Sequence, residues 1–149
     1  MLGRGFGEGY TEYTEDGTEG HGGIVGLRSS DTTRAIIGAA IEVHRALGPG
    51  LLESAYRRCL LHELQLRSFS VKEEVPLHLN YKGINVSNAY RMDLVVSDAV
   101  LVELKATSGS TPVHEAQLLT YLRLSGLRTG LLINFNVTKL TDGVLRRVL

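Results

Sequence analysis

Two apolar segments, residues 90–96 and 100–106, lie only three residues apart in the chain. Apolar and polar side chains alternate along parts of both segments, which is typical of β-strands. The intervening Ser97-Asp98-Ala99 is short enough to join them as a hairpin. If these three residues form the turn, Val96 faces Val100, and this register decides which side chains meet across the two strands.

The same register brings charged side chains together. Asp93 is expected opposite Glu103, and the alternation of strand side chains puts Lys105 on the same face. Directly opposed residues have Cβ atoms roughly 5 Å apart, so the two carboxylates repel each other unless one is protonated or a cation lies between them. Oxygen ligands at this spacing suit a hard divalent ion such as Mg²⁺ or Mn²⁺. The opposite face is expected to carry Met92, Leu94, Val102 and Leu104.

A solvated face is the alternative interpretation of these charges. Charges at alternate positions of a hairpin commonly face water, and Arg91 is expected opposite Lys105. However, Val95 and Leu101 share the face of the carboxylates. A strand pair followed by a crossover helix also tends to lie centrally in a sheet, with both faces covered. Buried charges persist when they are paired or coordinated, but the spacing alone leaves both interpretations open.

Helix and strand patterns follow one another from residue 31 to residue 149. Apolar spacings of three and four predict helices from Asp31 or Thr32 to Leu47, from Leu51 to Arg67 after Gly48-Pro49-Gly50, and from Pro112 to Leu124. Besides 90–96 and 100–106, strands are expected at 71–79, 84–86 and 128–135, with a final short strand or helix in 139–149. This order predicts a mixed sheet flanked by helices, an α/β or α+β sandwich.

Three further expectations concern the first two helices. Cys59 is expected in the core. Arg57 and Arg58 are candidate phosphate contacts, with a solvated charged face favoured for both. Glu42 and His44 are weighed as additional site residues, with surface or structural roles favoured for both.

The composition of this single domain limits its possible partners and its location in the cell. Residues 1–30 are expected to form a flexible, glycine-rich tail, and they hold two basic and five acidic side chains, a net charge of −3. Residues 31–149 hold 14 basic and 11 acidic side chains, which permits contact with phosphate without demanding it. No apolar run reaches the roughly 18 residues of a membrane span. With Cys59 as the only cysteine, no intrachain disulfide is possible, and a reducing cytoplasm is expected.

A resemblance to a known family emerges from the order of these residues. The order along the chain is Asp93, then Glu103-Leu104-Lys105, then Gln117 and Tyr121, four residues apart. This order resembles the D…ExK…QxxxY pattern of the PD-(D/E)XK nuclease superfamily, in particular its RecB-like branch. Upstream, residues 50–56 read GxxExxY, with Gly50, Glu53 and Tyr56 at the fixed positions. That motif names the GxxExxY proteins, small bacterial and archaeal members of the superfamily. The likeness covers about residues 32–149.

The resemblance implies a restriction-endonuclease-like core and a role for each matching residue. Asp93 and Glu103 match the metal-binding carboxylates, and Glu53 matches an acidic residue that completes the metal site directly or through water. Lys105 matches the lysine that orients or helps deprotonate the attacking water. Gln117 and Tyr121 match the helix that borders the site. The proline often found before the first aspartate is missing here.

The function implied by the resemblance is hydrolysis of phosphodiester bonds with Mg²⁺ or Mn²⁺, in DNA in preference to RNA. The alternative is a catalytically silent module of the same fold that binds nucleic acid or a protein partner. Nucleases of this size often act as dimers, so a homodimer or a larger complex is also expected.

Overall fold

A computed structural model describes residues 29–109 and 111–149. The expected tail therefore lies outside the described residues, apart from Ser29 and Ser30, which begin the first helix. The helices are α2 (Ser29–Leu47), α3 (Glu53–Leu66), α4 (Pro112–Ser125) and the short 3-10 helix η2 (Leu140–Gly143). The strands are β1 (Val71–Tyr81), β2 (Ile84–Val96), β3 (Val100–Lys105), β4 (Thr129–Asn134) and β5 (Val144–Val148). None of the described helices is long and apolar enough to cross a membrane.

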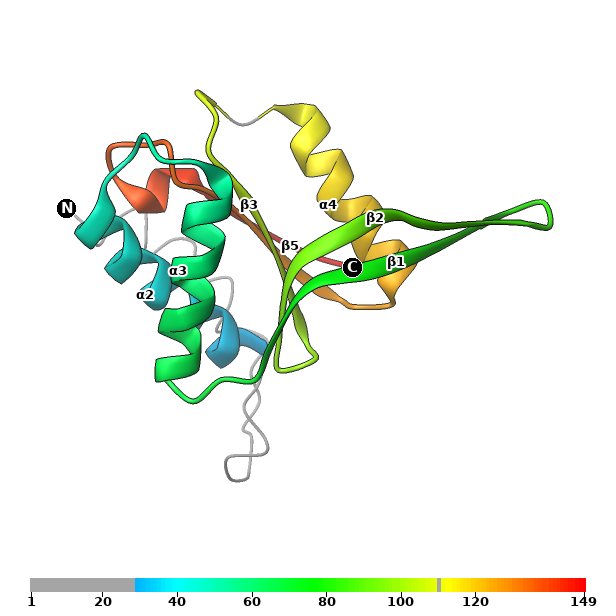
Figure 1. Ribbon diagram of the computed structural model, residues 1–149, viewed down its shortest axis with the longest axis horizontal. Coiled ribbons are helices and arrows are strands. Elements are labelled where there is room, and N and C mark those ends of the chain that lie inside the picture. The colour runs from blue at the N-terminus through cyan, green and yellow to red at the C-terminus, as the bar shows by residue number, and fades with distance from the viewer. Residues whose placement is uncertain (1–28, 110) are drawn as a thin grey trace.

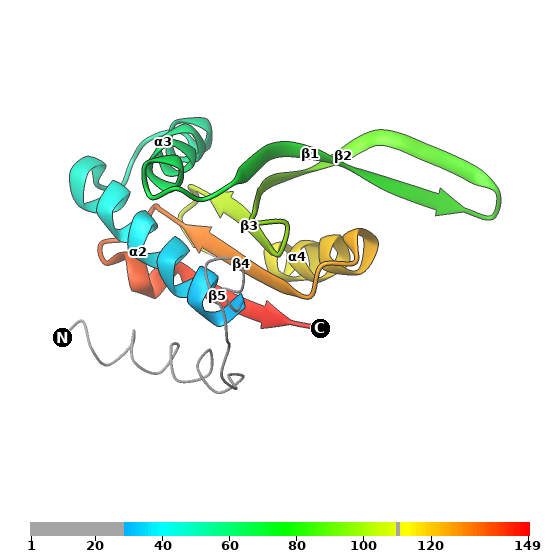
Figure 2. The ribbon, with the colours of Figure 1, turned by 90° about the horizontal axis from the view of Figure 1, so that it is seen from below.

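The strands form one mixed sheet in the order β1-β2-β3-β4-β5. β3 and β4 are parallel and are joined through α4, whereas the other neighbouring pairs are antiparallel. Helices α2 and α3 cover one face of the sheet and α4 covers the other (Figures 1 and 2). The predicted α+β sandwich is therefore confirmed, with β3 central and covered on both faces.

Two apolar clusters hold these layers together. On the face of α2 and α3, Leu94, Val102 and Leu104 pack with Leu60 and Leu64. On the face of α4, the residues Val95, Leu101, Leu118, Leu122 and Leu132 pack together. The division along β3 follows the period of two that the sequence predicts.

The β2–β3 hairpin has the expected register. Val96 pairs with Val100, and the amide of Ala99 donates to the carbonyl of Val96 at 3.0 Å. Met92 is the exception to the expected faces, because it packs with Val95 and Leu101 rather than with Leu94. The pairing of β1 with β2 skips the step between Glu73 and Val75, where Glu74 has a positive φ of 50°. The register is the same on both sides of this step, and the register shift lies farther along the hairpin, between Leu77 and Leu79.

The expected separate strands at 84–86 and 90–96 are one strand, β2. Leu77 pairs with Tyr90 and Leu79 with Val86, so the weakly patterned residues 87–89 form a bulge rather than a turn. The outer part of the β1–β2 hairpin extends beyond the other strands (Figure 2).

The expectation that Cys59 is a core residue is wrong, because its side chain is exposed. The buried face of α3 is set by Tyr56, Leu60 and Leu64. Cys59 precedes Leu60 by one residue, which is about 100° around a helix with 3.6 residues per turn, so it points away from that face. Leu52, which precedes the helix, is also 76% exposed.

The crossover helix α4 begins and ends where the sequence predicts. The side chain of Thr111 accepts a hydrogen bond from the amide of His114, and Pro112 occupies the first turn. Gly126 ends the helix with a φ of 79°, a left-handed conformation that glycine adopts without steric cost. These caps fix which residues of α4 face the end of β3.

Candidate active site at the divergence of β2 and β3

Two carboxylates lie where the backbone pairing of β2 and β3 stops. The ladder ends at Leu94 and Val102. Beyond it, the amide of Asp93 donates to Oε2 of Glu103 at 2.9 Å, and the amide of Leu104 donates to Oδ2 of Asp93 at 2.8 Å. Each side chain thus bonds to the backbone of the opposite strand, which anchors both carboxylates between the strands.

Burial makes the negative charge on this pair costly. Glu103 is only 3% exposed. Its burial, reinforced by the negative charge of Asp93, raises the pKa of Glu103 to about 8. Burial also raises the pKa of Asp93, although the bond from the Leu104 amide opposes this shift. A cation bound beside the two groups would offset this cost, and perturbed carboxylates of this kind are frequent at functional sites.

Lys105 links the strand residues to α4. Its Nζ donates to Oε1 of Gln117 at 3.2 Å, and Nε2 of Gln117 donates to the hydroxyl of Tyr121 at 3.2 Å. Burial raises the pKa of Tyr121, and the negative charges of Glu103 and Asp93 add to this effect. The three predicted residues therefore form one hydrogen-bonded chain beside the carboxylates.

Glu53 reaches the same site from the first turn of α3. Burial and the charge of Asp93 raise its pKa, whereas the positive charges of Lys105 and Arg57 lower it. The six residues that the sequence singled out thus lie at one site. Glu53 interacts with the others electrostatically, and no hydrogen bond within the described residues links it to them.

The loop before α3 explains the spacing of Gly50, Glu53 and Tyr56. Gly50 has a φ of 103°, a conformation that disfavours other residues. The hydroxyl of Tyr56 donates to the carbonyl of Gly48 and accepts from the amide of Leu51. Its buried ring stacks on Phe135 at a centroid distance of 4.4 Å. Tyr56 therefore fixes the loop from which α3 begins, and with it the position of Glu53.

Arg57 lies at this site, whereas the sequence interpretation favoured a solvated charged face for it over a phosphate contact. Its side chain is only 20% exposed. Its Nη2 lies 3.5 Å from Oε2 of Glu74, and its Nε lies 3.9 Å from Oε1 of Glu73. Its positive charge lowers the pKa values of Glu53 and Asp93. The signal in the sequence is the spacing of four from Glu53, which puts both side chains on one face of α3.

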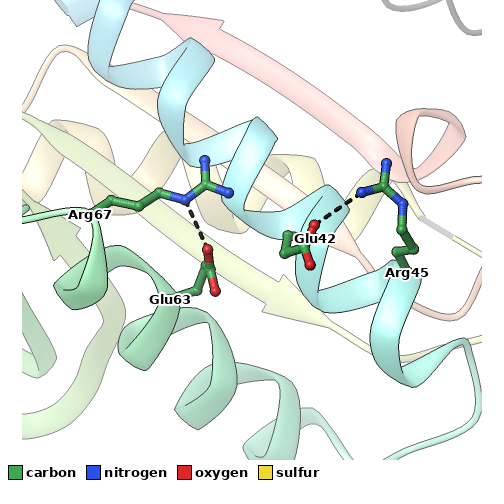
Figure 3. A network of polar contacts seen from close by, with 4 residues as sticks. All are labelled: Glu42, Arg45, Glu63 and Arg67. Carbon is green, nitrogen blue, oxygen red and sulfur yellow. Dashed lines mark hydrogen bonds and ion pairs between the residues drawn. The ribbon is translucent and has the colours of Figure 1, made fainter.

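Glu42 and His44 serve elsewhere. Glu42 pairs with Arg45 at 2.9 Å along α2 (Figure 3). On the neighbouring helix α3, Glu63 pairs with Arg67, the residue that follows the helix. The ring of His44 forms a 2.8 Å hydrogen bond with the carbonyl of Val137. These contacts agree with the surface and structural roles that the sequence favours.

The carboxylate oxygens of Asp93 and Glu103 suit a hard cation that is bound by two protein carboxylates. Each of Asp93 and Glu103 uses one oxygen toward the backbone, and no hydrogen bond within the described residues takes up the other oxygen. Across residues 29–109 and 111–149, no group of three or more His, Cys, Asp or Glu side chains is arranged to hold a metal ion. Mg²⁺ commonly binds through one or two carboxylates and keeps several waters, so a pair of carboxylates suffices for it.

Comparison with known proteins agrees with this architecture. The family model described as "PD-(D/E)XK nuclease superfamily" matches residues 30–148. The chain therefore belongs to the PD-(D/E)XK nuclease superfamily, and its mixed sheet between helices is the restriction-endonuclease-like core of that superfamily.

Two further comparisons are less informative. Among curated proteins, none matches the chain. Among solved structures, it is similar to that of SSO0001, with a TM-score of 0.35 and 15% identity over 98% of this chain and 75% of that chain. A TM-score of this size is too low to support a structural argument.

Proposed function

We propose that the protein hydrolyses phosphodiester bonds in nucleic acid with the help of a divalent metal ion, and that its substrate is DNA in preference to RNA. The observation that carries this proposal is the pair of buried carboxylates, Asp93 and Glu103, fixed between two diverging strands with Lys105 beside them. Membership of a nuclease superfamily supports the choice of reaction.

Asp93 and Glu103 are the proposed ligands of Mg²⁺ or Mn²⁺. Glu53 is proposed to join through water, because the described residues hold no group of three such side chains arranged to bind a metal ion directly. A divalent ion held by these residues would lower the pKa of a coordinated water and withdraw charge from the phosphate. Because burial raises the pKa of Glu103 to about 8, metal binding near neutral pH would release a proton from this site.

The remaining residues have proposed roles around the phosphate. Lys105 orients the attacking water or neutralises the charge that develops on the phosphate oxygens. Gln117 holds the ammonium group of Lys105 in place through its amide oxygen, and its amide nitrogen is bonded to Tyr121. Arg57, whose positive charge acts on Glu53 and Asp93, is proposed to contact a neighbouring phosphate.

A cleavage assay with matched variants tests this proposal. Wild type is expected to cut labelled DNA with Mg²⁺ or Mn²⁺ and to lose this activity with EDTA. Glu103→Gln and Lys105→Ala are expected to lower the rate at least a hundredfold. Glu63→Gln is the control, because Glu63 is a carboxylate on the surface of α3 paired with Arg67. Equal cleavage by wild type and both site variants would refute the catalytic assignment.

A catalytically silent module is the second candidate. The observation in its favour is that the described residues hold no three-residue metal group and that both central carboxylates already bond to backbone amides. Calorimetry with Mg²⁺ or Mn²⁺ and duplex DNA separates the two candidates. Binding of DNA without hydrolysis under any metal condition would favour the silent module.

Within the superfamily, we propose that the protein belongs to the GxxExxY group and its RecB-like branch. The support is the motif itself, because Gly50 and Tyr56 shape the loop that presents Glu53. A homodimer or a larger complex is the proposed assembly, which light scattering of the purified protein tests. A reducing cytoplasm is the proposed location, in keeping with an exposed, unpaired Cys59.

A further inference from the structure

An apolar groove lies directly beside the candidate active site. It has a volume of about 360 Å³ and separates the outer part of the β1–β2 hairpin from α4. Leu79 and Tyr90 line it from the hairpin, and six residues of α4 line it from the other side. None of the lining side chains is charged, which suits the flat apolar face of a ligand rather than an ion.

The groove and the candidate site share two residues. Gln117 and Tyr121 line the groove and also form the hydrogen-bonded chain to Lys105. A ligand in the groove is therefore adjacent to the groups proposed to act on the phosphate. The ring of Tyr90 lies 6.3 Å from that of Tyr121 at an interplanar angle of 60°, and Tyr90 is 46% exposed. An aromatic face is thus accessible at the edge of the groove.

Charge on the hairpin favours nucleic acid as the occupant. Residues 75–92 contain no acidic side chain, while Lys82 and Arg91 are basic and exposed. This stretch complements the negative charge of a phosphate backbone. A second copy of the chain would bring the same basic hairpin and would meet like charge at this edge.

We propose that the groove binds an unpaired base of single-stranded DNA, stacked on Tyr90, so that the adjoining phosphate lies at Asp93, Glu103 and Lys105. This inference rests on the proposed function, because it takes nucleic acid as the substrate. Bases in a duplex are stacked on each other, whereas an unpaired base exposes the face that aromatic side chains bind. The protein therefore prefers single strands or the unpaired parts of branched DNA to continuous duplex.

Fluorescence anisotropy with labelled oligonucleotides tests this preference. The probes are a 20-nucleotide single strand and the corresponding duplex, each titrated with full-length protein in Ca²⁺ in place of Mg²⁺. Tyr90→Ala is expected to raise the Kd for the single strand about tenfold and to leave the Kd for the duplex within about twofold, because only the unpaired base loses its stacking partner. Tyr90→Phe keeps the ring and is expected to retain the wild-type Kd.

Tyr81→Ala is the matched control, because Tyr81 is a 59% exposed tyrosine of the same hairpin that does not line the groove. The inference is overturned if wild type does not bind the single strand, if Tyr90→Ala weakens both probes equally, or if it changes only the oligomeric state. The assay measures binding alone. If Tyr90→Ala weakens only single-strand binding and wild type does not cleave DNA, the groove binds an unpaired base and the proposed hydrolysis is refuted. If wild type cleaves DNA and Tyr90→Ala does not weaken single-strand binding selectively, hydrolysis is supported and the base-binding groove is refuted.

Discussion

Glu103 connects the chemistry of the site to the stability of the fold. Its pKa rises from 4.5 to about 8 on folding, mainly through burial. Between these values the folded state binds more protons than the unfolded state, so the free energy of unfolding falls as pH rises through this window and levels off above it. Burial moves the pKa of Asp93 in the same direction.

Glu103→Gln is neutral at every pH and keeps an oxygen that can accept the bond from the Asp93 amide. We expect this variant to be more stable than wild type above pH 8 by up to about 5 kcal/mol, with the difference shrinking as pH falls toward 4.5. Urea denaturation in metal-free buffer across this range measures it, with Glu63→Gln as control. A difference that stays constant with pH would contradict the assignment of the shift to Glu103.

Tyr56 permits a test of the loop before α3. Tyr56→Phe keeps the ring stacked on Phe135 but removes the hydroxyl that bonds to Gly48 and Leu51. We expect a loss of about 1–3 kcal/mol in the free energy of unfolding, because a carbonyl and an amide lose their partner. Chemical denaturation gives the value, and Tyr81→Phe, at an exposed position, is expected to change it little.

At the level of residues, the sequence predicted that the two carboxylates lie together, but it did not predict the contacts that surround them. The distance of Asp93 and Glu103 from the turn is a local property, so alternation and register are enough to pair them. The bonds from each carboxylate to the opposite backbone depend on the divergence of two strands, which no local pattern encodes. The place of Arg57 depends in the same way on how α3 packs against β1.

Among the elements, α4 depends on one glycine for its packing. A Cβ added at Gly130 on β4 would lie 2.9 Å from Cδ1 of Leu118, and both methyl carbons of Leu122 are also close. Gly130→Val is therefore expected to displace α4, to cost about 1–3 kcal/mol, and to weaken the contact of Gln117 with Lys105.

Thermal denaturation together with the cleavage assay measures both effects of this substitution. Gly109→Ala is the control, because a Cβ there has open space. A fully stable Gly130→Val protein with unchanged activity would show that α4 tolerates displacement without consequence for the site.

The elements themselves were largely predictable. The caps Thr111 and Gly126 and the turn at Ser97 act through local backbone geometry, so the sequence located them correctly. The continuity of β2 was not predictable, because residues 87–89 look like an interruption. The strand continues past them because Val86 and Tyr90 on either side pair with β1. Cys59 was misplaced since the buried side of α3 depends on the packing of Tyr56 and Leu60.

For the molecule as a whole, metal binding should appear as added stability. A ligand that binds only the folded state stabilises it by about 2.7 kcal/mol at one hundred times its Kd. We expect Mn²⁺ to raise the Tm of wild type by several degrees at pH 8 and by less at pH 6, where Glu103 holds a proton.

Differential scanning fluorimetry with a Mn²⁺ titration measures this shift. Glu63→Gln should respond as wild type does, and Glu103→Gln should lose most of the response. An equal rise in Tm for all three proteins would indicate binding elsewhere on the surface.

The five strands within the described residues lie side by side in the same order as they occur in the chain. Each strand therefore pairs with the strand that precedes it in the chain, although α4 lies between β3 and β4. Short sequence separations between contacting residues, as in the antiparallel pairs, favour fast folding. The hydrogen bonds that hold Asp93 and Glu103 lie between β2 and β3 alone. The carboxylate pair can therefore form before β5 joins the sheet.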